Sequence, residues 1–172
     1  MRRESANTLP PQTISPLGQR LRFTILGLQR SGNRMLTDLL REVSLTPSQA
    51  EIITILAEHE TLTLRQLGQL LVCEVGSPSR AIDLLVNRGL VLRETSSRDR
   101  RSINLTLTEH ARTLLPTIRA ADHALETWFN DCLTSDEQHT LTTLLNRLTV
   151  DPSLRHALDQ RFPPSAEAAD PA

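Results

Sequence analysis

The chain has 172 residues, of which 38% are hydrophobic, and its 19 arginines against 20 acidic residues give a formal net charge of −1. That length allows one domain with a substantial hydrophobic core and additional terminal segments. No apolar run approaches the roughly 20 residues that cross a bilayer, and the opening "MRRESANTLPPQTISP" lacks the apolar stretch of a secretory signal, so we expect a cytoplasmic protein without a membrane partner.

Helical periodicity dominates the first half of the chain. Residues 1–14 are polar, contain a Pro-Pro pair and predict a flexible tail. Leucine and isoleucine at three-to-four spacing then predict a helix from Ser15 to about Arg41. Three Thr-x-x-Gln or Thr-x-x-Glu capping boxes and one Ser-Pro pair predict four further helix starts, at Thr46, Thr63, Ser77 and Thr134.

The pattern changes after Gly89, a residue suited to the left-handed end of a helix. The stretch "LVLRETSSRDRRSINLTLT" predicts two short strands joined by a polar turn. Thr108 then caps a long predicted helix over residues 109–133, in which Pro116 should cause a kink or delay the start. A short helix around residues 153–160 is predicted next, and we expect the final "PPSAEAADPA" to be disordered.

Residues 64–87 have the pattern of a helix-turn-helix: a short helix, the turn "CEVGS" and a second helix that begins "SPSRA". In this motif the second helix enters the DNA major groove with its amino-terminal residues toward the base edges. An arginine there can contact guanine through two hydrogen bonds, and serine hydroxyls can contact phosphate or base. The candidate contact residues are Ser77, Pro78, Ser79 and Arg80.

Positive charge is concentrated between residues 76 and 101, where six arginines face three acids and give a local charge of +3. Three of them, Arg98, Arg100 and Arg101, flank Asp99 in the turn of the predicted hairpin. A hairpin beside a groove-bound helix projects its tip over the adjacent minor groove, whose negative potential attracts arginine. Asp99 can orient a neighbouring guanidinium through a charge-assisted hydrogen bond. The alternating residues expected to attach the hairpin to the core are Ile103, Leu105 and Leu107.

Three stretches, "LTPSQ", "LVNRGLVLR" and "DRRSINLTLTEHAR", carry a family resemblance. Through them, residues 15–150 resemble the MarR family of winged helix-turn-helix transcription regulators, with Ala111 where that family usually has Gly. The resemblance implies a mainly α fold with a small β-hairpin wing and with N- and C-terminal dimerisation helices. It implies a DNA-binding lobe at about 46–108, dimerisation helices at about 15–42 and 109–150, and a partly disordered C-terminal extension over 151–172.

The function that the resemblance implies is sequence-specific binding of double-stranded DNA by a homodimer on a pseudo-palindromic operator. Most members are repressors, and many are released by a small-molecule effector. Two alternatives remain open. One is thiol-based redox regulation through Cys73, which lies in the turn of the helix-turn-helix, although a small residue filling a tight corner explains the same position. The other is a winged-helix protein-interaction module without DNA binding.

Enzymatic signatures are missing from the sequence. It has no glycine-rich phosphate loop, no nucleophile elbow and no cluster of metal ligands, and its five histidines are scattered. The two cysteines, Cys73 and Cys132, fit no metal-binding spacing. We therefore expect no enzyme activity, no cofactor and no metal site.

Overall fold

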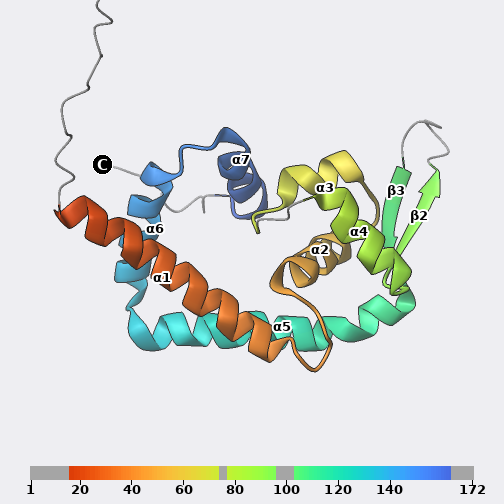
Figure 1. The fold of residues 1–172 in the computed structure, drawn as a ribbon, viewed down its shortest axis with the longest axis horizontal. Helices are drawn as coiled ribbons and strands as arrows, with labels where there is room; N and C mark the ends of the chain where they lie inside the picture. The colour runs from red at the N-terminus through yellow and green to blue at the C-terminus, as the bar shows by residue number, and fades with distance from the viewer. Residues whose placement is uncertain (1–15, 74–76, 96–102, 164–172) are drawn as a thin grey trace, which may run out of the picture. The chain divides into compact units, whose positions relative to one another are not determined.

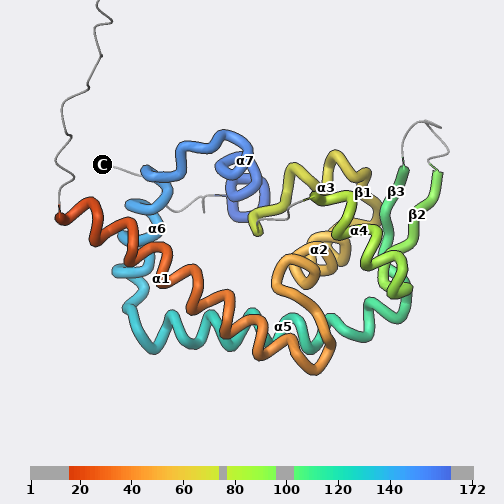
Figure 2. The backbone as a smooth tube through the Cα atoms, in the orientation of Figure 1, coloured from red at the N-terminus to blue at the C-terminus, as the bar shows by residue number. Residues whose placement is uncertain are grey.

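The computed structural model describes residues 16–73, 77–95 and 103–163. Backbone contacts divide the chain into two units, residues 1–34 and residues 35–172. The first unit carries most of helix α1 (Pro16–Leu39), in which no residue is buried. The second unit carries the other helices and the strands, drawn as a ribbon in Figure 1 and as a tube in Figure 2.

The elements of the second unit are mainly helical. In chain order they are α2 (Pro47–Glu58), β1 (Leu62–Thr63), α3 (Leu64–Leu70), α4 (Pro78–Asn87), β2 (Val91–Thr95), β3 (Ile103–Leu107), α5 (Glu109–Cys132), α6 (Ser135–Leu148) and α7 (Pro152–Arg161). The strands form an antiparallel sheet in the order β1-β3-β2. A mainly α fold with a winged helix-turn-helix is thus confirmed. Among the described helices, none has both the length and the apolar character that a bilayer crossing requires.

The predicted helix starts are confirmed by their hydrogen bonds. The N–H of Gln49 donates to Thr46 Oγ1 at 3.2 Å, and the N–H of Thr46 donates to Gln49 Oε1 at 3.1 Å. Thr63 and Thr134 form the same reciprocal capping box at the starts of α3 and α6. Each cap satisfies an amide that the first helical turn leaves unpaired, and contributes about 0.5–2 kcal/mol to stability.

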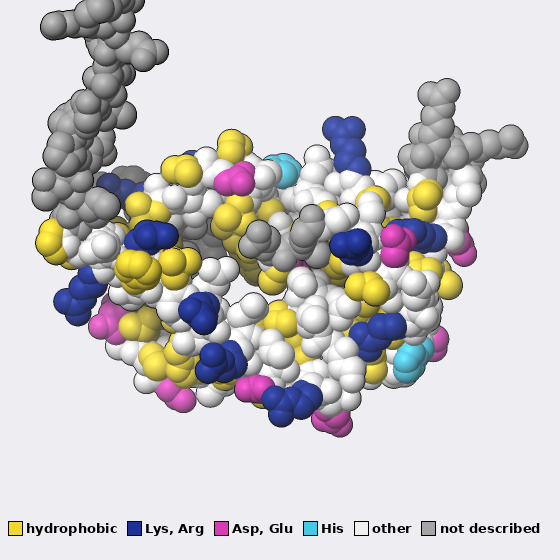
Figure 3. Space-filling view, in the orientation of Figure 1, with side chains coloured by type: hydrophobic (Ala, Val, Ile, Leu, Met, Phe, Trp, Pro, Cys, Tyr) yellow, Lys and Arg dark blue, Asp and Glu magenta, His cyan; other side chains and the backbone are white. Residues whose placement is uncertain are grey.

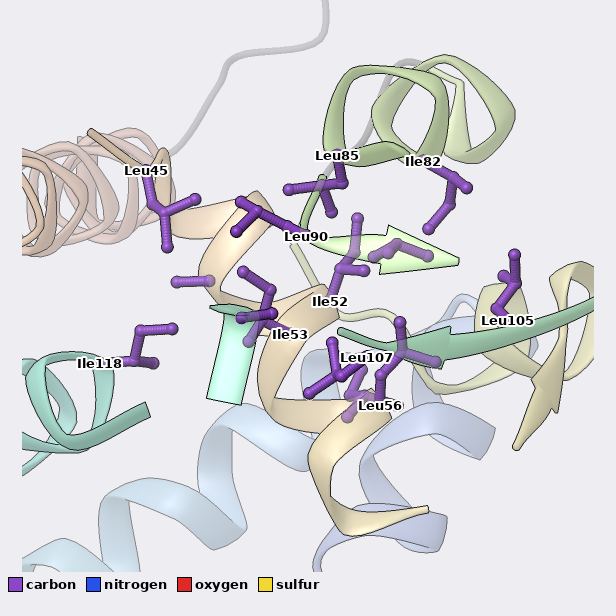
Figure 4. Packing of buried hydrophobic residues seen from close by; sticks show 14 of the residues in the cluster. Leu45, Ile52, Ile53, Leu56, Ile82, Leu85, Leu90, Leu105, Leu107 and Ile118 are labelled. Carbon is purple, nitrogen blue, oxygen red and sulfur yellow. The ribbon is translucent and has the colours of Figure 1, made fainter. Parts of the chain in front are cut away.

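The hydrophobic core of the second unit is organised around α2. Figure 4 shows side chains from α2, α4, the sheet and α5 converging on one cluster. Because α4 directs Ile82 and Leu85 into this cluster, its opposite face is left in solvent. Burial of each such side chain contributes about 1.5–3 kcal/mol and fixes the orientation of α4 on the lobe. The residues of α2 in the cluster are Ala50, Ile52, Ile53, Ile55 and Leu56.

The sheet differs from the predicted hairpin in two respects. It includes a third strand, β1, in which Leu62 lies opposite Leu105 of β3. Two residues are too few to show an alternating pattern, so this strand could not be predicted. In addition Ile103, predicted to face the core with Leu105 and Leu107, is 49% exposed. It lies at the end of β3 next to the wing turn, beyond the reach of the cluster.

Thr108 joins the end of α4, the sheet and the start of α5. Its hydroxyl donates to the carbonyl of Gly89 at 2.8 Å and accepts from the N–H of Ala111 at 3.1 Å. Gly89 has a φ of +68°, the left-handed conformation predicted for it. Pro116 lies inside α5 without delaying its start at Glu109.

Candidate nucleic-acid interface

The candidate interface begins at the amino end of α4. Ser77 adopts an extended backbone conformation there, and its side chain accepts a hydrogen bond from the N–H of Arg80 at 3.5 Å. The side chains of Ser77, Ser79 and Arg80 are exposed, and Pro78 is half-buried. The first-turn amide groups and the helix dipole favour an anion at this end. All four predicted residues of α4 and its cap therefore lie at one surface end of the helix.

Arg80 differs from the other described arginines of this region in its contacts. Arg93 forms an ion pair with Asp83 at 2.6 Å and donates to the carbonyl of Ser79 at 3.4 Å, which ties β2 to α4. Arg88 donates to the carbonyl of Ser44 at 2.8 Å. The sequence alone did not distinguish Arg88 and Arg93 from Arg80, because the groups that bind these two arginines lie in other parts of the chain. Arg80 makes no side-chain contact of this kind with the described residues, and so remains available to a ligand.

The wing is described only at its base. β2 and β3 pair from Val91 opposite Leu107 to Thr95 opposite Ile103, and residues 96–102 connect them. In this register the last residue of β2 lies opposite the first residue of β3, so the connecting segment leaves and re-enters the sheet at the same end of the strand pair. The predicted contact residues of the turn lie outside the described residues: Arg98, Asp99, Arg100 and Arg101.

A surface cavity of about 700 Å³ lies between α3, α4 and the sheet. Its wall includes Ser79 and the Arg93–Asp83 pair, and it also includes Arg65 of α3. Arg65 is exposed and adds a positive charge that sequence reasoning missed. Its position could have indicated this role, because Arg65 lies two residues after the Thr63 cap, in the first turn of the first helix of the helix-turn-helix. Figure 3 shows basic side chains spaced singly over the face that it presents.

Comparison with known proteins relates one segment of the chain to a known family. Residues 45–103, from the start of α2 through the wing turn, match the model of the MarR family. This segment is a MarR-family domain. The organic hydroperoxide resistance transcriptional regulator of Bacillus subtilis (strain 168) is 30% identical over 93 residues, which are 54% of this chain and 63% of that protein. The aligned part therefore spans less than two thirds of that regulator.

Solved structures of MarR-family proteins share the fold. A mutant MarR from Escherichia coli, complexed with operator DNA, superposes with a TM-score of 0.67 at 24% identity and covers 79% of this chain and 95% of its own. The organohalide-sensing regulator RdhR-CbdbA1625, in its 2,4-dichlorophenol-bound form, gives a TM-score of 0.70 at 17% identity, covering 86% of this chain and 88% of its own. The winged helix-turn-helix arrangement described above is thus that of the MarR family.

Cys73, the candidate redox residue, lies half-buried just after α3. Its N–H donates to Glu51 Oε2 at 2.9 Å. Burial first, and then the charge and hydrogen bond of the Glu51 carboxylate, raise the pKa of the Cys73 thiol to about 11 against the opposing charge of Arg161. A thiol needs an electropositive setting to ionise near neutral pH. This environment favours the interpretation of Cys73 as a small residue filling a corner of the MarR lobe.

We predict that alkylation will distinguish the two thiols. At pH 8, raising the pKa from 9.0 to about 11 lowers the thiolate fraction of Cys73 about a hundredfold. Iodoacetamide should therefore label the exposed Cys132 first, and Cys73 should react at a useful rate only as the pH rises toward 11. Peptide mass spectrometry over a pH series measures both rates, with Cys132→Ser as the single-thiol control. Rapid labelling of Cys73 at pH 8 would restore the redox hypothesis.

Metal binding has no support among the described residues. In that part of the chain, no three His, Cys, Asp or Glu side chains come together as a metal site would require. Some acidic side chains of the lobe form ion pairs with arginines instead, as Asp83 does with Arg93 and Glu51 with Arg161.

Proposed function

We propose that this protein is a sequence-specific transcriptional regulator that binds a pseudo-palindromic operator in double-stranded DNA as a homodimer. The observation that carries the proposal is the exposed Arg80 at the amino end of α4, beside a hairpin with an arginine-rich turn. The two other described arginines of this segment, Arg88 just after α4 and Arg93 of β2, are bound internally. The operator complex solved for the E. coli MarR supports the same use of this fold.

The proposed contacts divide between two grooves. Ser77, Pro78, Ser79 and Arg80 face the major groove, where Arg80 reads a base edge and the serines contact phosphate. The wing enters the neighbouring minor groove with Arg98, Arg100 and Arg101, and Asp99 orients one of these guanidinium groups. The lobe that presents them is the proposed DNA-binding lobe, at about residues 46–108.

Dimerisation is proposed to use the helices on either side of that lobe, at about residues 15–42 and 109–150. In the first unit, Leu17 is 75% exposed and other large apolar side chains of α1 are also exposed. In the second unit, α6 buries no residue, and Leu144 and Leu148 are about half exposed. Apolar faces of this extent are usually covered by a partner, and a second copy of the chain accounts for both.

A small-molecule effector is proposed to relieve repression. A cavity of about 160 Å³ lies in the second unit, beneath the helix-turn-helix, with apolar walls from Leu40 and Ile118 and carboxylates from Glu51 and Asp122. Burial raises the pKa of Asp122 against the attraction of Arg161. A cavity of this size accommodates a single aromatic ring. The 2,4-dichlorophenol-bound neighbour supports an effector of comparable size.

The test is a mobility shift with the DNA that lies upstream of the protein's own gene. We expect the full-length protein to shift this fragment at a concentration that leaves a shuffled fragment of the same length and composition unshifted. Regulators of this kind typically bind specific sites about 10³–10⁷ times more tightly than random DNA. Equal binding to both fragments, or none to either or to a selected random-sequence pool, would contradict the proposal and favour the protein-interaction alternative. Because the proposed ligand is operator DNA, we also propose a cytoplasmic location.

A further inference from the structure

Helix α7 lies past the segment that matches the family, and it packs against α3, the first helix of the helix-turn-helix. Its start is fixed by Asp151, whose carboxylate accepts the N–H of Ser153 at 2.8 Å. Arg155 of α7 donates to the carbonyl of Thr149, just after α6, at 2.6 Å. These contacts join α7 firmly to the end of α6. Its one fully buried residue is Ala157, and Leu154 and Leu158 on the same face are half-buried.

At the far end of α7, an ion pair joins this helix to α2. Arg161 donates to Glu51 Oε1 at 2.5 Å, and the two side chains are only 16% and 8% exposed. The same carboxylate accepts the N–H of Val72 at 2.9 Å and that of Cys73 at 2.9 Å. Glu51 therefore binds α7 on one side and, on the other, the segment that leads from α3 to α4.

The charge of Arg161 matters because Glu51 is shielded from water. A carboxylate in such a place needs a charged partner and hydrogen-bond donors to offset the loss of hydration. When Arg161 is removed, Glu51 gains by moving toward solvent, and such a movement breaks its bonds to Val72 and Cys73. The segment entering α4 then loses its only described side-chain attachment to α2, which leaves the buried Ile82 and the bond of Arg93 to the Ser79 carbonyl to position the amino end of α4.

We propose that α7 acts as a strap, in which Arg161 is a positioning residue for operator binding. Contacts run from α6 through α7, Arg161 and Glu51 to the segment before α4. They help to hold the amino end of α4 where it meets DNA, although α7 itself contacts no DNA. This inference rests on the proposed function, because positioning has an effect only if α4 binds DNA. It assigns a role to a C-terminal extension that the family resemblance leaves without one.

The experiment compares full-length wild type with Arg161→Gln, Arg161→Lys and, as a control, Asp159→Asn, which changes an exposed charged residue of the same helix α7. Hydrogen exchange followed by mass spectrometry reports on the amides of Val72 and Cys73 without any DNA. We expect faster exchange there in Arg161→Gln, largely restored protection in Arg161→Lys, and no change in Asp159→Asn.

Operator affinity is measured on the same four proteins. Arg161→Gln should weaken binding by about two- to thirtyfold, the range for residues that act through others. The slope of affinity against salt should stay as in wild type, because no phosphate contact is lost. Loss of a directly binding arginine would reduce that slope, and general destabilisation would not be rescued by Lys.

Each outcome separates the strap from the proposed function. If the wild type binds no operator, the proposed function is refuted. Hydrogen exchange at Val72 and Cys73 alone then decides whether α7 acts as the strap. Wild type that binds, with Arg161→Gln unchanged in exchange and affinity, overturns the strap. Should Arg161→Gln fail to fold, Glu51→Gln replaces it: this variant keeps an acceptor for one amide but loses the ion pair, and it must show the same local exchange and weaker binding.

Discussion

Replacing Arg101 with alanine will abolish operator binding and leave the protein dimeric. Arg101 is the last arginine of the wing turn, two residues before β3 begins at Ile103. The strands fix the base of the wing, and the negative potential of a narrow minor groove attracts a guanidinium. With about 1–3 kcal/mol per specific arginine contact, loss in both subunits of a dimer lowers the binding free energy by about 2–6 kcal/mol. Fluorescence anisotropy measures the affinity, and light scattering the mass.

The comparison variants make this result interpretable. Arg80→Ala removes the exposed arginine of α4 and should weaken binding to a similar extent while relaxing discrimination at one base pair. Asp159→Asn, on α7 and outside both the proposed contact residues and the proposed dimerisation helices, should bind as wild type does. Unchanged affinity in Arg101→Ala would remove the wing from the mechanism and leave α4 as the binding element.

Salt will weaken operator binding steeply. A dimer that neutralises about 6–10 phosphates loses about 10³–10⁵ in affinity between 50 and 200 mM salt, because binding releases condensed counterions. A chain with a formal net charge of −1 can show this only if a few arginines are placed against the backbone of the duplex. An affinity series at four or more salt concentrations gives the slope.

The salt dependence of affinity in each variant then gives the number of phosphate contacts that the substitution removes. Arg101→Ala should flatten the plot of log affinity against log salt by about one unit for each phosphate contact that it removes. A wild-type slope near zero is incompatible with the proposed interface and would point to the protein-interaction alternative.

Local chemistry explains which parts of this fold were predictable. The capping boxes at Thr46, Thr63 and Thr134 and the left-handed Gly89 depend on neighbours within three residues, and each was found where predicted. The β2–β3 hairpin follows from alternation over a few residues. Strand β1 was missed because its pairing with β3 exists only once the chain has folded.

The candidate site was predictable in part, for the same reason. Residue type and position marked Arg80 as exposed at a helix start, and the structure places it there. By sequence, Arg88 and Arg93 belong to the same basic segment as Arg80. In the structure, Arg93 is paired with Asp83, and Arg88 donates to the carbonyl of Ser44. The pair of Arg161 with Glu51 joins residues 110 positions apart, a separation at which no pattern in the sequence connects two side chains.

The hydroxyl of Thr108 has a mechanical consequence. One oxygen atom touches both the carbonyl that ends the α4 turn and the amide that starts α5. The Thr108 N–H also donates to the carbonyl of Leu90, the residue before β2, at 3.1 Å. Thr108 thus joins the end of the second helix of the helix-turn-helix to the start of the long helix through a single residue, so a substitution at this one position would loosen both helix ends together.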